Sequence, residues 1–433
     1  MLPEWEDLRE HASEIKEHTL THLADYLEEF ARNLESNGVI VHWAKDAQEF
    51  NEIAYSILAE HNVKKLVKSK SMLTEECEMN KYLIAKGIDV VETDLGERIL
   101  QLMNLKPAHI VVPAAHITRD EVGELFEKDG ISKDIGNHDP TYLTQCARYS
   151  LRQEFIEADA GMTGCNFGVA STGDCVVCTN EGNADMSTSI PRLHIVSMGI
   201  DKVIPNYDAL AVFQRLLARS ATGQPSVSFT SQFRKARPGA EMHVILVDNG
   251  RSNIIADQLH WRTAKCIRCG ACMNTCPVYR RSMGYSYNYF IPGPIGINLG
   301  MVHNPKKHSG NVSACSLCLS CDLVCPVKVA PGSQIYYWRQ ALEGFGTENK
   351  EKKYMSVAMT ELYQHPAIYS VATKYAHFAN IIPQKMMDVK PNTWSVGHDM
   401  PHFPKKTFHT LYKQMMEEEK EKEKRRGGRG RGG

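Results

Sequence analysis

The sequence lacks the patterns that mark secreted and membrane-spanning chains. Its first residues are polar and acidic, with no charged segment leading into an apolar one, so we expect no signal peptide. No stretch of about 18 uncharged apolar residues occurs, so we expect no transmembrane helix. We therefore expect a cytoplasmic protein, whose peripheral association with a membrane, through a partner, stays open.

Net charge is almost absent as well. Lys and Arg total 50 and Asp and Glu total 51, which gives a net charge of −1 and no general attraction to nucleic acid. The dinucleotide fingerprint G-x-G-x-x-G after a strand is also missing, so hydride chemistry on a bound nicotinamide or flavin is not indicated. The segment 416–433 is rich in charge and glycine, and we expect it to be disordered and to bind no nucleic acid.

Cysteine, by contrast, is abundant, and eight of the 13 cysteines fall into two runs with the spacing C-x2-C-x2-C-x3-C-P. The runs consist of Cys266, Cys269, Cys272 and Cys276, then Cys315, Cys318, Cys321 and Cys325. Bacterial ferredoxins use this spacing to hold two [4Fe–4S] clusters. Zinc sites usually take paired C-x2-C units with four ligands in total, which fits two complete runs poorly.

The spacing also predicts how the two clusters share their ligands. Three thiolates two residues apart wrap one corner of a cluster, whereas the fourth points away and reaches the other cluster. We therefore expect the first cluster to bind Cys266, Cys269, Cys272 and Cys325. We expect the second cluster to bind Cys315, Cys318, Cys321 and Cys276. This sharing places the clusters close together, which suits electron passage between them.

The segments before the cysteine runs alternate between strand-like and helix-like patterns, which predicts a mostly parallel α/β domain. Helices are expected at 4–35, 45–60, from about 96, and at 120–128, 141–158 and 207–219. Strands are expected at 39–41, 89–91, 109–112, 194–198 and 242–247. The segments 166–170 and 175–179 flank Gly173 and predict a β-hairpin. Residues 350–395 have an amphipathic helical pattern with breaks at Pro366, Pro383 and Pro391.

These patterns divide the chain into five parts. We expect an N-terminal helical segment at 1–36, an α/β domain at 37–252 and a two-cluster ferredoxin-like domain at 253–345. A helical C-terminal region at 346–415 and the disordered tail at 416–433 complete the prediction.

Two features of the α/β domain are candidates for chemistry. Cys175 and Cys178 are spaced like a redox or metal pair, but side chains three apart in a strand point to opposite faces, so we favour ordinary sheet packing. Glu181 follows the same strand in a polar, glycine-containing turn. It is a candidate catalytic carboxylate, or the turn is simply a capped loop.

Several of these motifs resemble those of a known family. Five segments resemble the lactate-utilisation (LUD) domain: 161–167 (GMTGCNF), 171–173 (STG), 179–183 (TNEGN), 191–194 (PRLH) and 199–203 (GIDKV). The segments 266–272 (CIRCGAC) and 292–296 (PGPIG) fit the cluster region of the same family. Over roughly residues 40–390, the chain resembles the lactate utilisation protein B family.

The resemblance implies a LUD domain with a fold similar to ribose-phosphate isomerases and CoA transferases, joined to a helical two-cluster module and a helical C-terminal region. It implies an electron-carrying role in oxidising L-lactate to pyruvate, with a cysteine-rich iron–sulfur subunit and a second LUD-domain protein as partners. It transfers no catalytic residue. Two alternatives stay open: an enzyme acting on a CoA ester or sugar phosphate with Glu181 as nucleophile, and an iron–sulfur sensor or scaffold.

Overall fold

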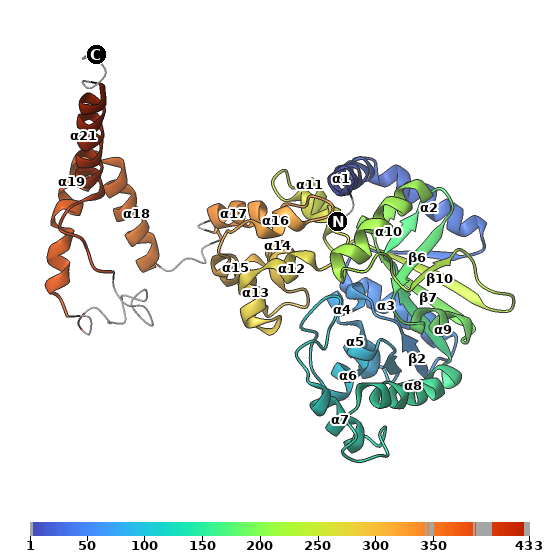
Figure 1. Cartoon of the computed structure of the whole chain (residues 1–433). Coiled ribbons are helices and arrows are strands. Elements are labelled where there is room, and N and C mark those ends of the chain that lie inside the picture. Colours follow the sequence, from blue (N-terminus) through green and yellow to red (C-terminus); the bar gives the residue numbers. More distant parts are fainter. Residues whose placement is uncertain (1–2, 343, 346–349, 384–385, 387–400, 428–433) are drawn as a thin grey trace. The chain divides into compact units, whose positions relative to one another are not determined.

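A computed structural model describes residues 3–342, 344–345, 350–383, 386 and 401–427. The chain separates into two compact units, residues 1–347 and 348–433 (Figure 1). No helix in the described part of the chain is long and apolar enough to cross a membrane.

The first unit is built on a six-stranded, wholly parallel sheet with the strand order β1-β10-β7-β4-β2-β3. In that order the strands are Ile40–Ala44, Glu241–Val247, Leu193–Gly199, Ala160–Gly164, Lys65–Lys68 and Asp89–Glu92. The central strands carry long apolar runs because both faces of the sheet are covered. The α/β prediction is therefore confirmed.

Alternation along the strands assigns side chains to the two faces. Ile245 in β10 and Leu66 in β2 pack with Phe50 of α3 on one face, whereas Val244 and Leu246 of β10 point to the other. The helices of this region are α1 (Trp5–Thr21), α2 (Leu23–Ser36), α3 (Ala47–Glu60), α4 (Met72–Glu76), α5 (Met79–Ala85), α6 (Leu95–Met103), α7 (Arg119–Lys128), α8 (Pro140–Glu157), α9 (Asn183–Ser189) and α10 (Tyr207–Ala221), with a 3-10 turn η1 (Ile200–Lys202).

Local chemistry explains where several helices begin. The Asp46 carboxylate accepts a hydrogen bond from the backbone N–H of Glu49 at the start of α3, and Asn206 caps α10 in the same way. Thr118 and Glu121 form a reciprocal capping box at the start of α7. These caps satisfy backbone donors that the first helical turn leaves unpaired.

A second sheet of four strands lies beside the first, in the order β8-β5-β6-β9 (Val203–Ile204, Phe167–Val169, Asp174–Thr179 and Phe229–Phe233). Strands β5 and β6 are antiparallel, so the predicted hairpin is confirmed. Gly173 in its turn has a φ of +74°, a conformation that glycine adopts without strain.

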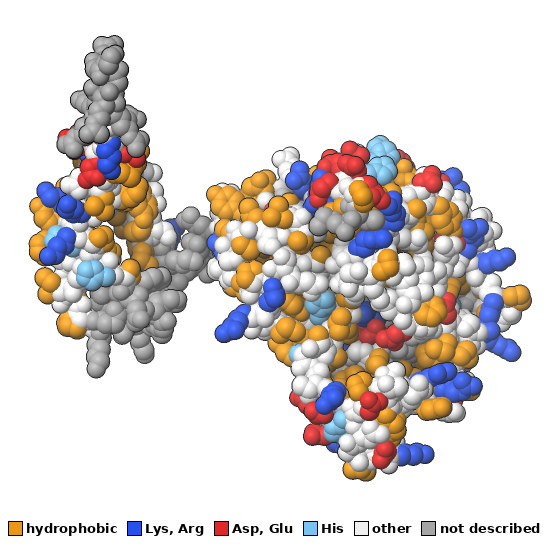
Figure 2. Space-filling model, viewed as in Figure 1, with side chains coloured by type: hydrophobic (Ala, Val, Ile, Leu, Met, Phe, Trp, Pro, Cys, Tyr) orange, Lys and Arg blue, Asp and Glu red, His pale blue; other side chains and the backbone are white. Residues whose placement is uncertain are grey.

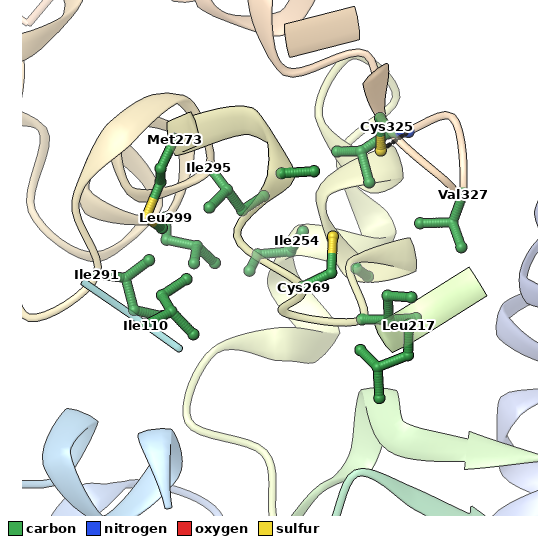
Figure 3. Close-up of a cluster of buried hydrophobic side chains, with 14 of the residues drawn as sticks. Ile110, Leu217, Ile254, Cys269, Met273, Ile291, Ile295, Leu299, Cys325 and Val327 are labelled. Carbon is green, nitrogen blue, oxygen red and sulfur yellow. Dashed lines mark hydrogen bonds between the residues drawn. The ribbon is translucent and has the colours of Figure 1, made fainter. Parts of the chain in front are cut away.

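Beyond β10 the described residues of the first unit form helices joined by loops, with no further strand. It comprises α11 (Arg251–Ala256), η2 (Trp261–Lys265), α12 (Ala271–Thr275), α13 (Pro277–Ser282), η3 (Tyr285–Tyr287), α14 (Gly293–His303), α15 (Pro305–Ala314), α16 (Ser320–Val324) and α17 (Pro331–Ala341). Its core is continuous with that of the α/β region, because Leu217 of α10 and Ile110 belong to the same buried cluster as Met273 and Ile295 (Figure 3). The cysteine-rich region is therefore packed onto the α/β region within one compact unit.

The second unit contains α18 (Lys350–Gln364), α19 (Pro366–Tyr375), η4 (Ala376–Ile381) and α21 (Phe408–Gly427). The predicted break at Pro366 is confirmed, η4 ends just before Pro383, and Pro391 lies outside the described residues. The expectation of disorder from residue 416 is wrong up to Gly427, which ends α21. Glu417 and Lys420, like Glu418 and Lys422, have the spacing at which opposite charges support a helix. Residues 428–433 lie outside the described residues.

The expected strand at 109–112 is also wrong, because these residues form an irregular loop. The cause is local. The backbone N–H groups of Val111 and Val112 both donate to Nδ1 of His109, at 3.0 and 3.1 Å. Donors engaged by a side chain cannot join a β-ladder.

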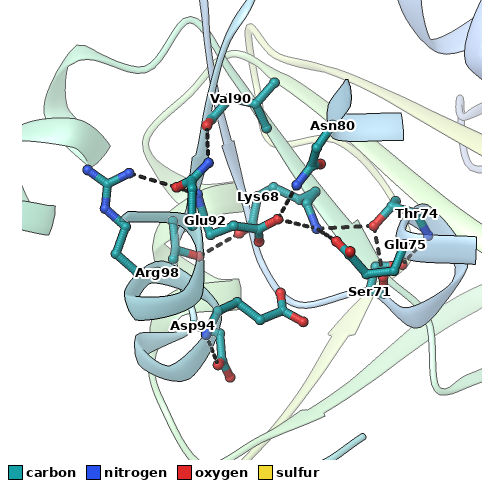
Figure 4. Close-up of polar contacts among 12 residues, drawn as sticks. Lys68, Ser71, Thr74, Glu75, Asn80, Val90, Glu92, Asp94 and Arg98 are labelled. Carbon is teal, nitrogen blue, oxygen red and sulfur yellow. Dashed lines mark hydrogen bonds and ion pairs between the residues drawn. The ribbon is translucent and has the colours of Figure 1, made fainter. Parts of the chain in front are cut away.

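Lys68, at the end of β2, is the centre of a buried polar network (Figure 4). Its ammonium nitrogen lies 2.8 Å from Glu92 Oε1 and 3.6 Å from Glu75 Oε1, and its side chain is 0% exposed. Burial lowers the pKa of Lys68, but the charges of Glu92, Glu97 and Glu75 outweigh burial and hold that pKa above its ordinary value. Burial and Glu92 raise the pKa of Glu97 well above its ordinary value. One lysine thus offsets a group of three carboxyls.

We expect Lys68→Met to lower the free energy of unfolding by about 3–5 kcal/mol, because it leaves buried carboxylates without a cation. Lys65→Met is the matched control, since Lys65 lies in the same strand but is 22% exposed and pairs at the surface. That variant should lose no more than about 1 kcal/mol. Urea denaturation under anaerobic conditions measures both values, and equal losses would contradict the role given to Lys68.

Candidate functional site

The two cysteine runs fold into loops of nearly the same backbone shape. In the first run Arg268 and Gly270 have left-handed φ angles of +60° and +78°, and in the second run Leu317 and Leu319 have +53° and +59°. These residues occupy equivalent places, two and four positions after the first cysteine of each run. Left-handed residues between the cysteines curl the backbone so that successive thiols turn to the same side. This is the local geometry that cluster binding needs.

Backbone donors point at the thiols in both loops. The N–H of Arg268 lies 3.4 Å from Cys266 Sγ, and the N–H of Leu317 lies 3.4 Å from Cys315 Sγ. The N–H of Val329 lies 3.2 Å from Cys325 Sγ. Such donors stabilise the negative charge on cluster sulfur. The donor set therefore fits two iron–sulfur clusters.

The eight thiols are distributed unevenly between interior and surface. Cys269, Cys321 and Cys325 are buried, Cys318 is exposed, and Cys266, Cys272, Cys276 and Cys315 are intermediate. Burial raises the pKa of Cys272, and neighbouring charge on Cys266, Cys269 and Cys325 raises it further. Burial also raises the pKa of Cys315, with Cys276 and Cys318 among its charged neighbours. Cys325 thus lies near the first three cysteines of the other run, and Cys276 near Cys315.

A buried ion network fixes the first loop to the α/β region. Arg251, at the start of α11, donates from Nε to Asp201 Oδ1 at 2.7 Å and from Nη2 to Glu76 Oε2 at 2.8 Å. All three side chains are less than a tenth exposed. Next to Asp201, Lys202 donates to the backbone carbonyl of Cys266 at 2.8 Å. These bonds connect α4, η1 and α11 to the loop that carries Cys266.

A cavity of about 390 Å³ opens where the parallel strands end, and we call it the sheet-edge cavity. Residues that follow β2, β4 and β6 line it, including Lys70, Asn166 and Glu181. The carboxyl edge of a parallel sheet is the usual place for a ligand in α/β folds. The opposite wall comes from the loop at 110–113, from α10 and from the first cysteine loop, including Cys269. The cavity therefore touches Cys269 of the first cysteine run.

Glu181 is the acidic group of this cavity that sequence reasoning singled out. Its Oε2 accepts a hydrogen bond from the N–H of Leu95 at 3.3 Å, at the start of α6. Burial, helped by the charge of Asp94, raises the pKa of Glu181 to about 7. A carboxyl that is half protonated near neutral pH suits proton exchange better than nucleophilic attack. Glu181 thus lines the cavity as an acid whose pKa lies above its ordinary value.

Other lining residues escaped sequence reasoning. Arg268 lies between Cys266 and Cys269, within a motif whose cysteines alone indicated a function. Lys70 follows β2, a strand that the alternating pattern did not reveal. Asn183 is part of the segment quoted for the family resemblance, yet its residue type alone carries no sign of a ligand. Only the fold brings these residues together around one cavity.

The other paired cysteines behave as expected for a strand. Cys175 of β6 is buried against Val196 and Met198. Cys178 packs against a different group of apolar side chains and lines the sheet-edge cavity. The strand therefore separates the two thiols, as its predicted placement requires.

Comparison with known proteins adds two family matches, a LUD domain at residues 27–248 and a 4Fe-4S dicluster domain at 262–329. Lactate utilization protein B of Oceanobacillus iheyensis is 37% identical over 97% of this chain and 90% of its own length. The protein of the same name from Bacillus pumilus is 37% identical over 97% and 91%. This chain belongs to the lactate utilization protein B family.

Membership in the lactate utilization protein B family agrees with the geometry. The dicluster match means that the chain carries two [4Fe–4S] clusters, in the region where the eight cysteines lie. An uncharacterized electron transport protein of Escherichia coli, YkgF, is 35% identical over 97% of this chain and 90% of its own length. The chain is thus an iron–sulfur protein of the lactate utilization protein B family.

Single cysteine variants test the ligand assignment. The wild-type chain should hold about eight iron atoms and Cys318→Ala about four, because one cluster loses a ligand. If the fourth ligands cross over, Cys276→Ala should remove the same electron paramagnetic resonance signal as Cys318→Ala. Cys325→Ala should remove the same signal as Cys269→Ala. Cys146→Ala, outside both runs, should keep all the iron. A match between Cys276→Ala and Cys269→Ala would contradict the crossed assignment.

We expect the free energy of unfolding to depend on pH through Glu181. Its folded pKa of about 7 lies above the ordinary value of 4.5, so the native state binds more protons than the unfolded chain between these pH values. Its contribution is present at low pH and is lost as the pH rises through 7. Glu181→Gln should therefore flatten the fall in unfolding free energy between pH 5 and pH 8. Unchanged slopes in urea titrations across that range would show that Glu181 titrates normally.

Proposed function

We propose that this chain is the electron-transfer subunit of an assembly that oxidises L-lactate to pyruvate in the cytoplasm. Its partners in this proposal are a cysteine-rich iron–sulfur subunit and a second LUD-domain protein. The names of its relatives support the lactate assignment. We further propose that its LUD domain shares the fold of ribose-phosphate isomerases and CoA transferases, which its parallel sheet supports.

The observation that carries this proposal is the placement of the thiols between the sheet-edge cavity and the surface. We assign Cys266, Cys269, Cys272 and Cys325 to the first cluster and Cys315, Cys318, Cys321 and Cys276 to the second. Each cluster supplies one-electron chemistry when bound. Cys269 lines the cavity, whereas Cys318 is exposed. The two ligand sets therefore form a path from the interior to the outside.

The surface around Cys318 suits contact with a redox partner. Leu319, Leu323 and Val324 are 43%, 75% and 36% exposed beside it. Exposed apolar side chains clustered next to a cluster ligand favour a short-lived protein contact that brings two redox centres together. We call residues 318–324 the outer patch, and we propose that it receives the partner iron–sulfur subunit.

The second unit offers a separate apolar surface. None of the described residues of α19 is buried. Figure 2 shows hydrophobic side chains in orange on the surface of this unit. The large apolar side chains exposed along α18 and α19 are Tyr354, Met355, Val357, Tyr363, Ile368, Val371 and Tyr375. Helices with so much exposed apolar surface gain stability by packing against another protein. This supports a role within a larger assembly.

Growth tests the proposal. Cells that lack the gene should fail to grow on L-lactate as sole carbon source and should grow normally on pyruvate. The wild-type gene should restore growth, whereas Leu323→Glu should restore it poorly, because a buried charge weakens an apolar contact. Ile135→Glu is the matched control, since Ile135 is 74% exposed on the α/β region and should behave as wild type.

Normal growth of the deletion strain, with no second gene copy, would overturn the lactate assignment. Redox cycling of the purified protein distinguishes a carrier from a sensor. A carrier keeps its iron through repeated reduction and oxidation, whereas loss of iron on each cycle would favour the sensor.

A further inference from the structure

Three side chains with metal-binding atoms meet at the amino edge of the large sheet. Glu241 and His243 lie at the start of β10, and His61 directly follows α3. Because parallel strands all begin at one edge and end at the other, this group lies at the opposite end of the sheet from the sheet-edge cavity. It also lies outside the 4Fe-4S match at 262–329. We call His61, Glu241 and His243 the amino-edge triad.

The ligand atoms of the amino-edge triad are close enough together to reach one ion. His243 Nε2 lies 2.6 Å from Glu241 Oε1, and His61 Nε2 lies 3.5 Å from the same oxygen. One ligand atom from each of the three residues lies within 4.8 Å of the other two. Two ligand atoms on a tetrahedral zinc ion are about 3.3 Å apart. Glu241 is 44% exposed, so its side chain has room to adjust to this spacing.

The imidazole of His61 is held with one nitrogen available for an ion. Its Nδ1 lies 2.9 Å from the backbone carbonyl oxygen of Ile57, which can only accept a hydrogen bond. Nδ1 therefore carries a proton and donates it, which leaves the lone pair of the neutral ring on Nε2, the nitrogen nearer Glu241. Histidines that bind metals are almost always oriented by such a bond from the second ring nitrogen.

His243 is oriented from its second nitrogen as well. Its Nδ1 lies 2.9 Å from Nε2 of His42 in β1, whereas its Nε2 faces Glu241. Either imidazole can be the donor in the bond between His42 and His243. His243 can therefore keep its proton on Nδ1 and offer the lone pair of Nε2 to an ion. The His243 side chain is 5% exposed, so its ring has little room to turn away.

Among the described residues, a second group of three acids is also close enough to reach one ion: Glu75, Glu92 and Glu97. There the ammonium of Lys68 already lies 2.8 Å from Glu92 Oε1, so a buried cation fills the place of an ion. The carboxylate of Glu241 instead faces two imidazoles, which are neutral at ordinary pH and bind metals in that form. The amino-edge triad is therefore the better candidate.

The ligand types select the kind of ion. Imidazole nitrogen suits zinc and other late transition metals, whereas calcium and magnesium take oxygen ligands. Zinc sites with three protein ligands keep a fourth position for water. The side chains of His61 and Glu241 are 30% and 44% exposed, so solvent reaches the amino-edge triad and can supply that ligand.

We propose that the amino-edge triad binds one zinc ion through Nε2 of His61, Nε2 of His243 and a carboxylate oxygen of Glu241, with water as the fourth ligand. His42 is a positioning residue that orients His243. The ion joins the end of α3 to the start of β10. This site is separate from the cysteine runs, so the proposal goes beyond the electron-transfer function and does not rest on it.

Zinc titration of the anaerobically purified, cluster-loaded full chain tests the proposal. After a wash with chelator, we expect one zinc ion per chain to bind at micromolar concentration or below, as measured by calorimetry. X-ray absorption at the zinc edge should show nitrogen and oxygen neighbours at about 2.0–2.1 Å and no sulfur at about 2.3 Å. This measurement distinguishes the amino-edge triad from any site built on cysteine.

His61→Ala and Glu241→Gln should each weaken zinc binding by at least about 100-fold, because each removes one ligand of three. His42→Phe should weaken it about tenfold, and His42→Gln, which keeps a hydrogen-bonding group, should restore most of the affinity. His11→Ala is the matched control, since His11 also lies near a glutamate, 3.7 Å from Glu14, but stands exposed on α1. Iron content equal to that of the wild type shows that each variant is folded.

The proposal is overturned if no zinc binds at micromolar concentration or if the tightly bound zinc has sulfur neighbours. It is also overturned if His61→Ala and Glu241→Gln bind zinc as tightly as His11→Ala. None of these results bears on electron transfer, because the amino-edge triad shares no residue with the cysteine runs.

Discussion

The buried contact between Arg251 and its two acidic partners, Asp201 and Glu76, is the constraint on which the site depends. Each acid comes from a different element near the carboxyl edge of the large sheet, and Arg251 opens the first helix after the last strand. A buried charge has to be paired, so this contact leaves little freedom in how the cysteine-rich region meets the sheet. The apolar core formed by α10 and α14 supplies the rest of the attachment. Together they place Cys269 on the wall of the sheet-edge cavity.

The cluster region was the most predictable part of the chain. The cysteine spacing is a direct readout of cluster geometry, because consecutive ligands must reach neighbouring irons over short loops. The strands β7 and β10 were equally clear, since Leu193–Gly199 and Glu241–Val247 are long apolar runs. The hairpin around Gly173 followed from turn chemistry. In each case the residues of one short segment are sufficient to determine its local structure.

Elsewhere the local pattern and the structure disagree. Strand β2 contains Lys65 and Lys68, and Lys68 is buried only because carboxyls from other elements surround it. Strand β4 contains Gly161, where a Cβ atom would lie 1.6 Å from the carbonyl oxygen of Ser187, so a residue that suggests a turn is required for close packing of α9. The residues at 109–112 have a strand-like sequence, but the imidazole of His109 accepts hydrogen bonds from two backbone N–H groups that a β-ladder would need. Such long-range or side-chain effects leave no periodic signal in the sequence, and they also decide which residues line the cavity.

Because Cys318 is exposed and Cys269 is buried, the two thiols differ in their access to oxygen. Dioxygen and peroxide attack an iron–sulfur cluster from the side that solvent reaches, so the ligand set that includes Cys318 meets oxidants first. In the proposed set beside the sheet-edge cavity, Cys269 and Cys325 are buried. With the proposed division of ligands, a protein damaged by oxygen would lose the cluster bound by Cys318 first and keep the cluster beside the sheet-edge cavity.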